Sequence, residues 1–236
     1  MTDAASPRPR YDEGCLGAHA LNAIGDRWAL MVVRELMFRP KRFQMLRAGL
    51  PGVSASVLTQ RLEQLGRAGV VMHDDVLGSY ALTDLGRALH PALRELCRWA
   101  LLLPGHDPSR FISVTALMIS ISATVDAPRA AGLALRAGFL SGREGFEVTF
   151  SLRGQPMVRA CRTPEADFLL EGSGNALAAA IYGPGPAALA AAGLIVLRGE
   201  RAAAQEFTGL FSLAPQSSAS TDSPELTEQV PGASSS

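Results

Sequence analysis

The sequence predicts an α+β protein with two domains, a mainly helical first domain with a small two- or three-stranded β-wing and a second domain of sheet and helices. Apolar residues recur at three- and four-residue spacings through the first part of the chain, which is typical of packed helices. Short alternating runs parted by glycine and proline follow in the second part, which is typical of strands. A stretch with two prolines and a glycine, residues 103–108, separates the two patterns.

Length and composition agree with two domains. The chain has 236 residues, of which 47% are hydrophobic, so it exceeds the usual single-domain size and can bury substantial cores. We expect a DNA-binding and dimerisation domain at 15–104, a ligand domain at 105–214, and disordered ends at 1–14 and 215–236, where polar residues dominate. No apolar run reaches the roughly 18 residues of a membrane span, and the three cysteines are scattered. We therefore expect a cytoplasmic protein with reduced thiols and no membrane partner.

The charge of this neutral chain is concentrated in one segment. Residues 27–67 contain eight arginines and lysines but only Glu35 and Glu63 as acids, a net charge of +6. Over residues 1–105 there are 13 cations and ten acids, whereas residues 106–236 have nine and 12. A basic segment within a neutral chain favours a nucleic acid as partner of the first domain.

The first domain contains the elements of a winged helix-turn-helix in order. Helices are predicted at 16–24 and 28–38, with Asp26 as N-cap of the second, and at 43–50 after Pro40. Ser54 caps a fourth helix that ends at Gly69. Strands at 70–73 and 79–83, joined by residues 74–78, complete a wing.

The fourth helix is the predicted reader of the DNA major groove. Leu58, Leu62 and Leu65 form its buried stripe, so the polar residues on the opposite face meet solvent or DNA. Candidate contacts to base edges are Ser56, Thr59 and Gln60, of which Gln60 can bind adenine in two bonds. Candidate phosphate contacts are Lys41, Arg42, Ser54 and Arg61. Taken singly, each of these residues is equally explained as a solvated surface residue.

A long helix is predicted over residues 84–103, with Pro91 as the position where it would kink. Its apolar stripe consists of Leu85, Leu89, Leu93, Leu96, Ala100 and Leu103. Such a stripe needs a partner, and two-fold symmetry would place two reader helices about 34–36 Å apart, one turn of DNA. We expect a homodimer; packing against the second domain of the same chain is the alternative.

The second domain is predicted as a layer of sheet and helices. Its first segment, 111–125, is apolar throughout and is interpreted as a helix. Antiparallel strands are predicted at 133–139, 146–152, 157–162 and 167–171, and a last strand at 194–197. Helices are predicted at 175–182, 186–192 and 201–211.

Residues 15–99 resemble the HxlR family of bacterial winged-helix transcription regulators. The resemblance rests on Ile24-Gly-Asp-Arg-Trp28, Arg42-Phe43, the spacing of Ser54, Leu58, Arg61 and Leu62, and Tyr80-x-Leu82-Thr83. It implies a dimeric regulator that binds a double-stranded DNA operator through the helix after Ser54. The acidic segment at 73–78 departs from the commonly basic wing of the family, so we expect little wing contact with DNA.

The same resemblance makes Cys15 a redox candidate, because several family members carry a responsive cysteine there. A position before a helix favours the thiolate, but the adjacent acids Asp12 and Glu13 oppose it. An inert thiol is the alternative.

Residues 166–211 are similar to the sterol-carrier-protein-like domain. The similarity lies in the runs at 166–171, 176–183, 191–199 and 207–211. It implies a pocket for an apolar small-molecule effector that would modulate DNA binding. Phe168, Leu177, Ile181 and Phe207 are either pocket residues or ordinary core residues.

The sequence gives little support to catalysis, metal binding or a cofactor. The four histidines are dispersed, and the glycine patterns at 172–177 and 183–188 lack the βαβ context of a dinucleotide site. His73, Asp74 and Asp75 could ligate a metal but are more often solvated in a wing. We therefore expect no enzyme, no metal and no cofactor, but a DNA-binding repressor modulated by a hydrophobic molecule or by thiol state. The rival hypothesis is a lipid- or small-molecule-binding protein whose winged helix contacts other proteins.

Overall fold

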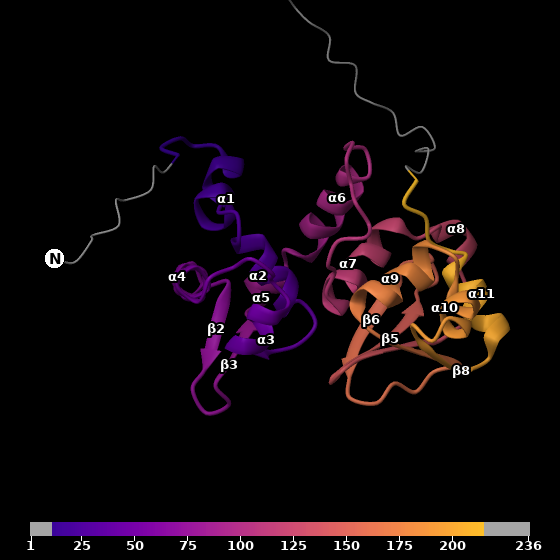
Figure 1. Ribbon diagram of the computed structural model, residues 1–236. Helices are drawn as coiled ribbons and strands as arrows, with labels where there is room; N and C mark the ends of the chain where they lie inside the picture. Colours follow the sequence, from indigo (N-terminus) through magenta and orange to yellow (C-terminus); the bar gives the residue numbers. More distant parts are fainter. Residues whose placement is uncertain (1–10, 215–236) are drawn as a thin grey trace, which may run out of the picture.

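The computed structural model describes residues 11–214 (Figure 1). The predicted disordered tail at 215–236 and the first ten residues of the predicted arm at 1–14 lie outside the described residues. Residues 11–105 are called here the N-terminal half and residues 106–214 the C-terminal half. Each half has its own cluster of buried apolar side chains, and the fold is α+β as predicted.

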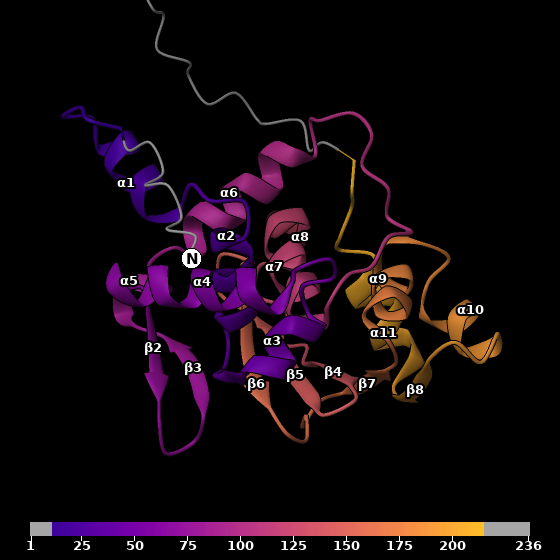
Figure 2. The same ribbon diagram turned by 60° about the vertical axis from the view of Figure 1, so that its left-hand side comes forward.

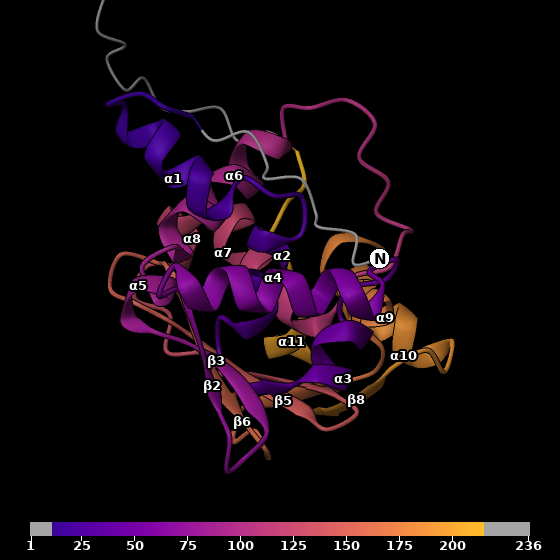
Figure 3. The same ribbon diagram turned by 90° about the vertical axis from the view of Figure 1, so that its left-hand side faces the viewer.

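The N-terminal half contains the winged helix-turn-helix. Its elements are α1 (Leu16–Ile24), α2 (Ala29–Leu36), β1 (Lys41–Arg42), α3 (Phe43–Ala48), α4 (Ala55–Arg67), β2 (Val71–Asp74), β3 (Ser79–Leu82), α5 (Asp84–Arg87) and α6 (His90–Ala100). The wing is a three-stranded antiparallel sheet in the order β1-β3-β2. Figure 3 shows α4 running across the front of this half and the β2–β3 hairpin extending below it.

The helix predicted over 84–103, with Pro91 as its kink position, is divided in two just before that proline. The chain forms α5 and α6 instead, with the break at Ala88 and Leu89 and Pro91 in the first turn of α6. Proline lacks the amide hydrogen that an uninterrupted helix needs, and the first turn of a helix tolerates it. Thr83 caps α5 by accepting from the amide of Gly86 at 3.1 Å. A Cβ at Gly86 would collide with the carbonyl oxygen of Val70, so the small residue lets α5 lie against the start of the wing.

The C-terminal half is a five-stranded sheet with helices packed on it. Its elements are α7 (Val114–Thr124), α8 (Ala127–Ala130), β4 (Ala137–Ser141), β5 (Glu144–Phe150), β6 (Pro156–Cys161), β7 (Phe168–Glu171), α9 (Gly174–Tyr182), α10 (Pro186–Ala191), β8 (Val196–Gly199) and α11 (Arg201–Thr208). The strand order is β6-β5-β4-β7-β8. Figure 1 shows the helices above this sheet in the view.

One prediction about this sheet needs correction, because not all of its strands are antiparallel. β7 pairs with β4 in parallel, whereas the other pairs are antiparallel. After β6 the chain returns along the sheet, and a Cβ at Gly138 of β4 would meet Pro164 and Ala166 of that return segment. Alternation of apolar residues gives the faces of a strand but not its direction.

Helix α7 lies between the two halves and belongs to both cores. Leu117, Met118 and Ile121 pack in the C-terminal cluster, whereas Ile119 packs in the N-terminal cluster with residues of α2 and α4. Phe38, just after α2, packs against both clusters, and its ring lies edge-on to Phe146 with centroids 5.9 Å apart. Figure 2 shows α7 behind α2 and next to the sheet. The all-round apolar pattern that predicted this helix is that of a buried helix.

Among residues 11–214, none of the helices combines the length and the apolar character that a membrane crossing requires.

Candidate nucleic-acid interface

Helix α4 is positioned as a reader helix. Leu58, Leu62 and Leu65 are buried in the N-terminal core, so they fix which face of the helix meets solvent. The hydroxyl of Ser54 accepts from the amide of Val57 at 3.3 Å and caps the helix as predicted. Ser54 itself and the three predicted base-contact residues, Ser56, Thr59 and Gln60, are all exposed. The structure therefore brings these four residues to one surface at the N-terminal part of α4.

Arg61 is not on this surface, which corrects its prediction as a phosphate contact. Its side chain is 1% exposed, and its Nε lies 3.0 Å from Oδ1 of Asp26 in the turn between α1 and α2. Its two terminal nitrogens donate to the side-chain oxygens of Gln64 and Gln60. Arg61 thus fixes α4 against the α1–α2 turn. The sequence pattern placed it on the flank of the helix but did not show what packs there.

Lys41 is likewise buried, so the structure contradicts its prediction as a phosphate contact. Its side chain is 1% exposed, with Nζ 3.0 Å from Glu35 and 2.7 Å from Glu144. Nζ also donates to the hydroxyl of Thr115 at 2.9 Å. The ammonium group therefore has internal partners and is withdrawn from solvent.

The exposed positive charge is therefore smaller than the net charge of residues 27–67 indicates. Arg34 pairs with Glu35 at 2.9 Å, so it joins Lys41 and Arg61 among the cations held by internal partners. The exposed cations of this segment are Arg27, Arg42, Arg47 and Arg67. Of these, Arg42 precedes α3 and Arg47 lies in its last turn, so both are close in sequence to the turn that leads into α4.

Arg47 and Gln44 are candidate contacts that the sequence analysis did not assign. Both are exposed on α3, three residues apart, whereas Leu46 on the same helix is fully buried. Residues at this spacing share one helix face. In the sequence, the positions of these two polar residues on either side of Leu46 were the signal that could have identified them as exposed.

The structure also changes the chemistry of Gln60. Its Oε1 accepts from Nη2 of Arg61 at 3.2 Å. A two-bond contact to adenine uses both the amide oxygen and the amide nitrogen of glutamine. In the observed arrangement one of the two acceptor positions of the Gln60 amide oxygen is used by Arg61.

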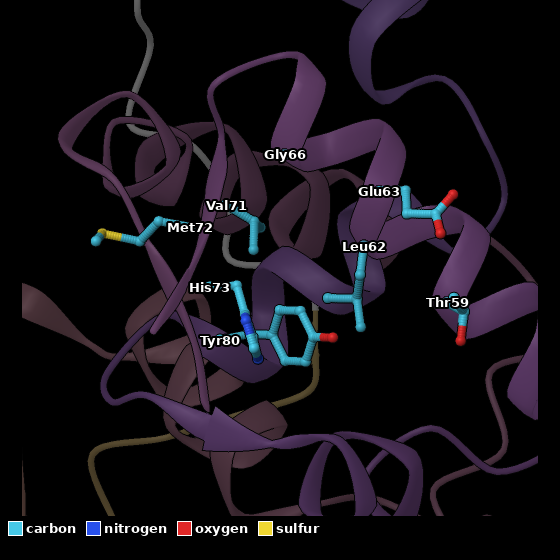
Figure 4. Close-up of a pocket in the computed structure, with 8 residues that line it drawn as sticks. All are labelled: Thr59, Leu62, Glu63, Gly66, Val71, Met72, His73 and Tyr80. Carbon is cyan, nitrogen blue, oxygen red and sulfur yellow. The ribbon is translucent and has the colours of Figure 1, made fainter. Parts of the chain in front are cut away.

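A hollow of about 320 Å³ lies between α4 and the wing (Figure 4). Thr59, Leu62, Glu63 and Gly66 line it from α4, and Val71, Met72, His73 and Tyr80 line it from β2 and β3. In Figure 4 the rings of His73 and Tyr80 lie together at the wing side, and their centroids are 4.5 Å apart.

The acids of the wing have structural partners. Oδ1 of Asp74 accepts from the amides of Val76 and Leu77 at 2.9 and 3.0 Å, which closes the turn of the hairpin. Asp75 lies 2.8 Å from Nδ1 of His73. Within the described residues there is no cluster of three or more potential metal ligands.

Known proteins are similar to this N-terminal half. The model of the HxlR-like helix-turn-helix family matches residues 23–105. The uncharacterized HTH-type transcriptional regulator YvaP of Bacillus subtilis is 36% identical over 97 residues, which are 39% of this chain and 84% of YvaP. The chain belongs to the HxlR-like helix-turn-helix family.

Two further similarities concern YodB of Bacillus subtilis. The HTH-type transcriptional regulator YodB is 31% identical over 86 residues, 34% of this chain and 77% of YodB. The crystal structure of quinone-bound YodB has 32% sequence identity and a TM-score of 0.33, covering 35% of this chain and 91% of that one. The HxlR-like match ends at residue 105 and does not extend into the C-terminal half.

The three cysteines of this HxlR-like protein differ in environment. Cys15 is exposed at the N-terminus of α1, where the backbone amides of Ala18 and Gly17 hold the pKa of its thiol below the ordinary value. Burial raises the pKa of the Cys97 thiol. Burial and the neighbouring Glu147 carboxylate raise that of Cys161. The thiolate is the reactive form, so the lowered pKa and the exposure of Cys15 both favour reaction at this thiol.

We predict that Cys15 is alkylated first. Under limiting iodoacetamide at pH 7, peptide mass spectrometry should find the label on Cys15 before Cys97 and Cys161. The pH at which its alkylation rate is half-maximal should lie below that of the other two, because a lowered pKa provides thiolate at lower pH. Replacing Cys15 by serine should remove the fast phase and leave the slow labelling unchanged. Faster labelling of either other cysteine would contradict this reading.

Proposed function

We propose that the protein is a cytoplasmic, dimeric, sequence-specific DNA-binding transcription regulator, a repressor, whose DNA affinity responds to a small molecule bound by its C-terminal half. The observation that carries the proposal is the exposed polar face at the capped N-terminal part of α4 beside the exposed arginines around α3. In a helix-turn-helix, the N-terminal residues of the second helix meet base edges while cations hold the phosphates. Membership of the HxlR-like family supports the same function.

The proposed contacts follow from exposure. Ser56, Thr59 and Gln60 face the bases, and Gln60 donates to acceptors such as the O6 or N7 of guanine. Phosphates lie against Arg42 and Arg47 and at the N-terminus of α4 by Ser54, where free amides and the helix dipole favour an anion. The acidic wing stays away from the phosphates.

Operator binding tests this assignment. Fluorescence anisotropy with fragments of the protein's own upstream DNA should give specific binding that weakens steeply with salt. Arg42→Gln and Arg47→Gln should each reduce the slope of log K against log salt by about 0.9, one phosphate contact each. Gln60→Ala should lower discrimination at one base pair by about tenfold, within the roughly 1–3 kcal/mol of a good base contact.

The matched control is Arg153→Gln, an exposed arginine in the loop between β5 and β6, which should leave the slope unchanged. Wild-type protein without salt-dependent binding to any upstream fragment would refute the proposal. Uptake of small molecules by such a protein would favour the rival function, a ligand-binding protein with a protein-contacting winged helix.

The proposed dimer uses exposed apolar side chains at one end of the N-terminal half. Leu16 of α1 is 85% exposed, and Trp99 of α6 and Leu102 after it are 57% and 67% exposed. Figure 1 shows α1 projecting from the body of this half. Of the predicted stripe, Leu93 is buried within the chain, whereas Leu85, Leu96 and Leu103 remain exposed. Large apolar side chains with this much exposure mark candidate interaction surfaces.

Charged substitutions should separate the dimer. Leu16→Glu and Trp99→Glu should each shift the protein toward monomer in sedimentation equilibrium, because a dimer interface would then bury an unpaired charge. Operator affinity should fall with the loss of the second half-site contact. Leu152→Glu, at a 91% exposed leucine between β5 and β6, is the control that should stay dimeric. A wild-type monomer, or dimers of unchanged stability, would contradict this interface.

The proposed small-molecule site lies in a groove between the two halves. In the C-terminal core Phe207 packs against Phe139, Phe150 and Phe168 with centroids 5.6–5.7 Å apart, so phenylalanines fill the layer between sheet and helices. Leu177 and Ile181 are also buried core residues. A groove of about 330 Å³ is lined instead by Met37, Phe38, Arg87, His90, Ser122, Pro156, Met157 and Val158.

This groove fits a small apolar molecule with one polar group. Its walls are mainly apolar, and Nε2 of His90 is buried without a hydrogen-bond partner in the described structure. Burial and the nearby Arg94 lower the pKa of His90, so the ring is neutral near pH 7 and can donate to or accept from a hydroxyl or carbonyl.

Mass spectrometry of the extracted, purified protein tests the groove. Wild-type protein should carry a small apolar molecule, and Met157→Glu should lose it because a carboxylate then lies at the apolar wall. Leu152→Glu, five residues away and outside the groove, should retain it. Equal extracts from wild type and Met157→Glu would place the ligand elsewhere or show that none is bound.

A further inference from the structure

A buried cluster of charged and hydroxyl side chains joins the two halves. Glu35 and Lys41, from the N-terminal half, are 0% and 1% exposed. Nζ of Lys41 lies 3.0 Å from Glu35 and 2.7 Å from Glu144, the first residue of β5. Ser113, the N-cap of α7, donates to the other oxygen of Glu35 at 2.6 Å, and Thr115 accepts from Lys41 at 2.9 Å. The cluster therefore has members from α2, β1, α7 and β5.

The place of Lys41 in the chain connects this cluster to DNA reading. Lys41 is the first residue of β1, which pairs with β3 of the wing, and α3 begins two residues later. Holding Lys41 therefore fixes the start of the helix-turn-helix and the base of the wing together. The groups that hold it from the other side, Thr115 and Glu144, belong to the C-terminal half.

The composition of the cluster indicates that it orients the two halves relative to each other more than it stabilises the fold. Two cations, Arg34 and Lys41, face two acids, Glu35 and Glu144, so the cluster is electrically balanced. Buried ion pairs often stabilise no more than apolar residues of the same volume, because the charges lose their hydration. They differ from apolar contacts in requiring particular distances and directions. Such bonds hold two packed surfaces in one relative placement.

We propose that Lys41 is a positioning residue for DNA binding, and that its ion pair with Glu144 and its hydrogen bond to Thr115 transmit the state of the C-terminal half to the reader helices. The proposal rests on the DNA-binding function proposed above. On this proposal Lys41 affects operator affinity from the interior of the protein, without contacting a phosphate. It also makes Glu144, 84 positions after Gln60, a determinant of operator affinity.

The salt dependence of binding separates a positioning role from a phosphate contact. Lys41→Met and Glu144→Gln should each weaken operator binding by about 3- to 30-fold, the range of measured couplings between distant sites. Both should leave the slope of log K against log salt unchanged, whereas loss of a phosphate contact lowers it by about 0.9. The double variant should lose less than the sum of the two single effects, because both changes break one ion pair.

Two controls accompany these variants. Arg42→Gln, next to Lys41 but exposed, should lower the slope. Glu171→Gln, which removes a surface ion pair with Arg198 in the same sheet, should change neither affinity nor slope. Circular dichroism confirms folding, and Thr115→Val replaces Lys41→Met if that variant does not fold.

Hydrogen exchange gives a readout that needs no DNA. Glu144→Gln should speed exchange of the amides in residues 41–47, although the substitution lies in the other half. Unchanged protection there, or unchanged affinity in a wild type that binds DNA, would overturn the proposal. A lowered salt slope for Lys41→Met would overturn it in favour of a direct phosphate contact. If wild type binds no DNA but Glu144→Gln speeds exchange, the DNA-binding function is refuted, while the coupling between Glu144 and residues 41–47 is supported.

Discussion

The structure depends on the burial of α7 between two cores. Ten of the 11 residues of this helix are buried, and they include serine and threonines as well as aliphatic residues. A helix that is apolar on all sides must be covered on all sides, so each half needs the other to bury it. Ile119 belongs to one core while Met118, its neighbour, belongs to the other. The chain boundary near residue 105 therefore separates two folding patterns but not two independent sets of contacts.

Burying α7 also brings its first turn against α2, which determines where charges can lie. The serine that caps α7 meets Glu35, and Glu35 in turn holds Lys41. Because the carboxylate and the ammonium group are withdrawn from water together, the cost of burying each is offset by the other. The outcome is that a lysine in the most basic segment of the chain contributes nothing to the surface charge. Net charge along a sequence thus overstates the charge available to a polyanion wherever the fold pairs it internally.

Much of the N-terminal half follows from local sequence signals. The leucine spacing of α4, the cap at Ser54 and the hairpin around 74–78 depend on neighbours within a few residues, and all three are confirmed. The parallel pairing of β4 with β7 and the interior positions of Lys41 and Arg61 depend on partners far away in the sequence. Periodicity shows which face of an element is apolar but not which element will cover it. The candidate base contacts were predicted from local spacing along α4. The phosphate contacts at Lys41 and Arg61 were mistaken because their burial depends on partners that are distant in the sequence.

The same burial constrains how a signal from the C-terminal half can reach DNA. Helix α6 packs on α7, and its Leu93 is buried, whereas its Leu96 and Trp99 remain exposed and accessible to a second subunit. A ligand in the groove between the halves would therefore act on the reader helices through α7, α6 and the Lys41 cluster within one subunit, and on the dimer only through α6. Even a small shift of α7 would displace side chains in both cores, because closely packed interiors transmit displacement instead of absorbing it.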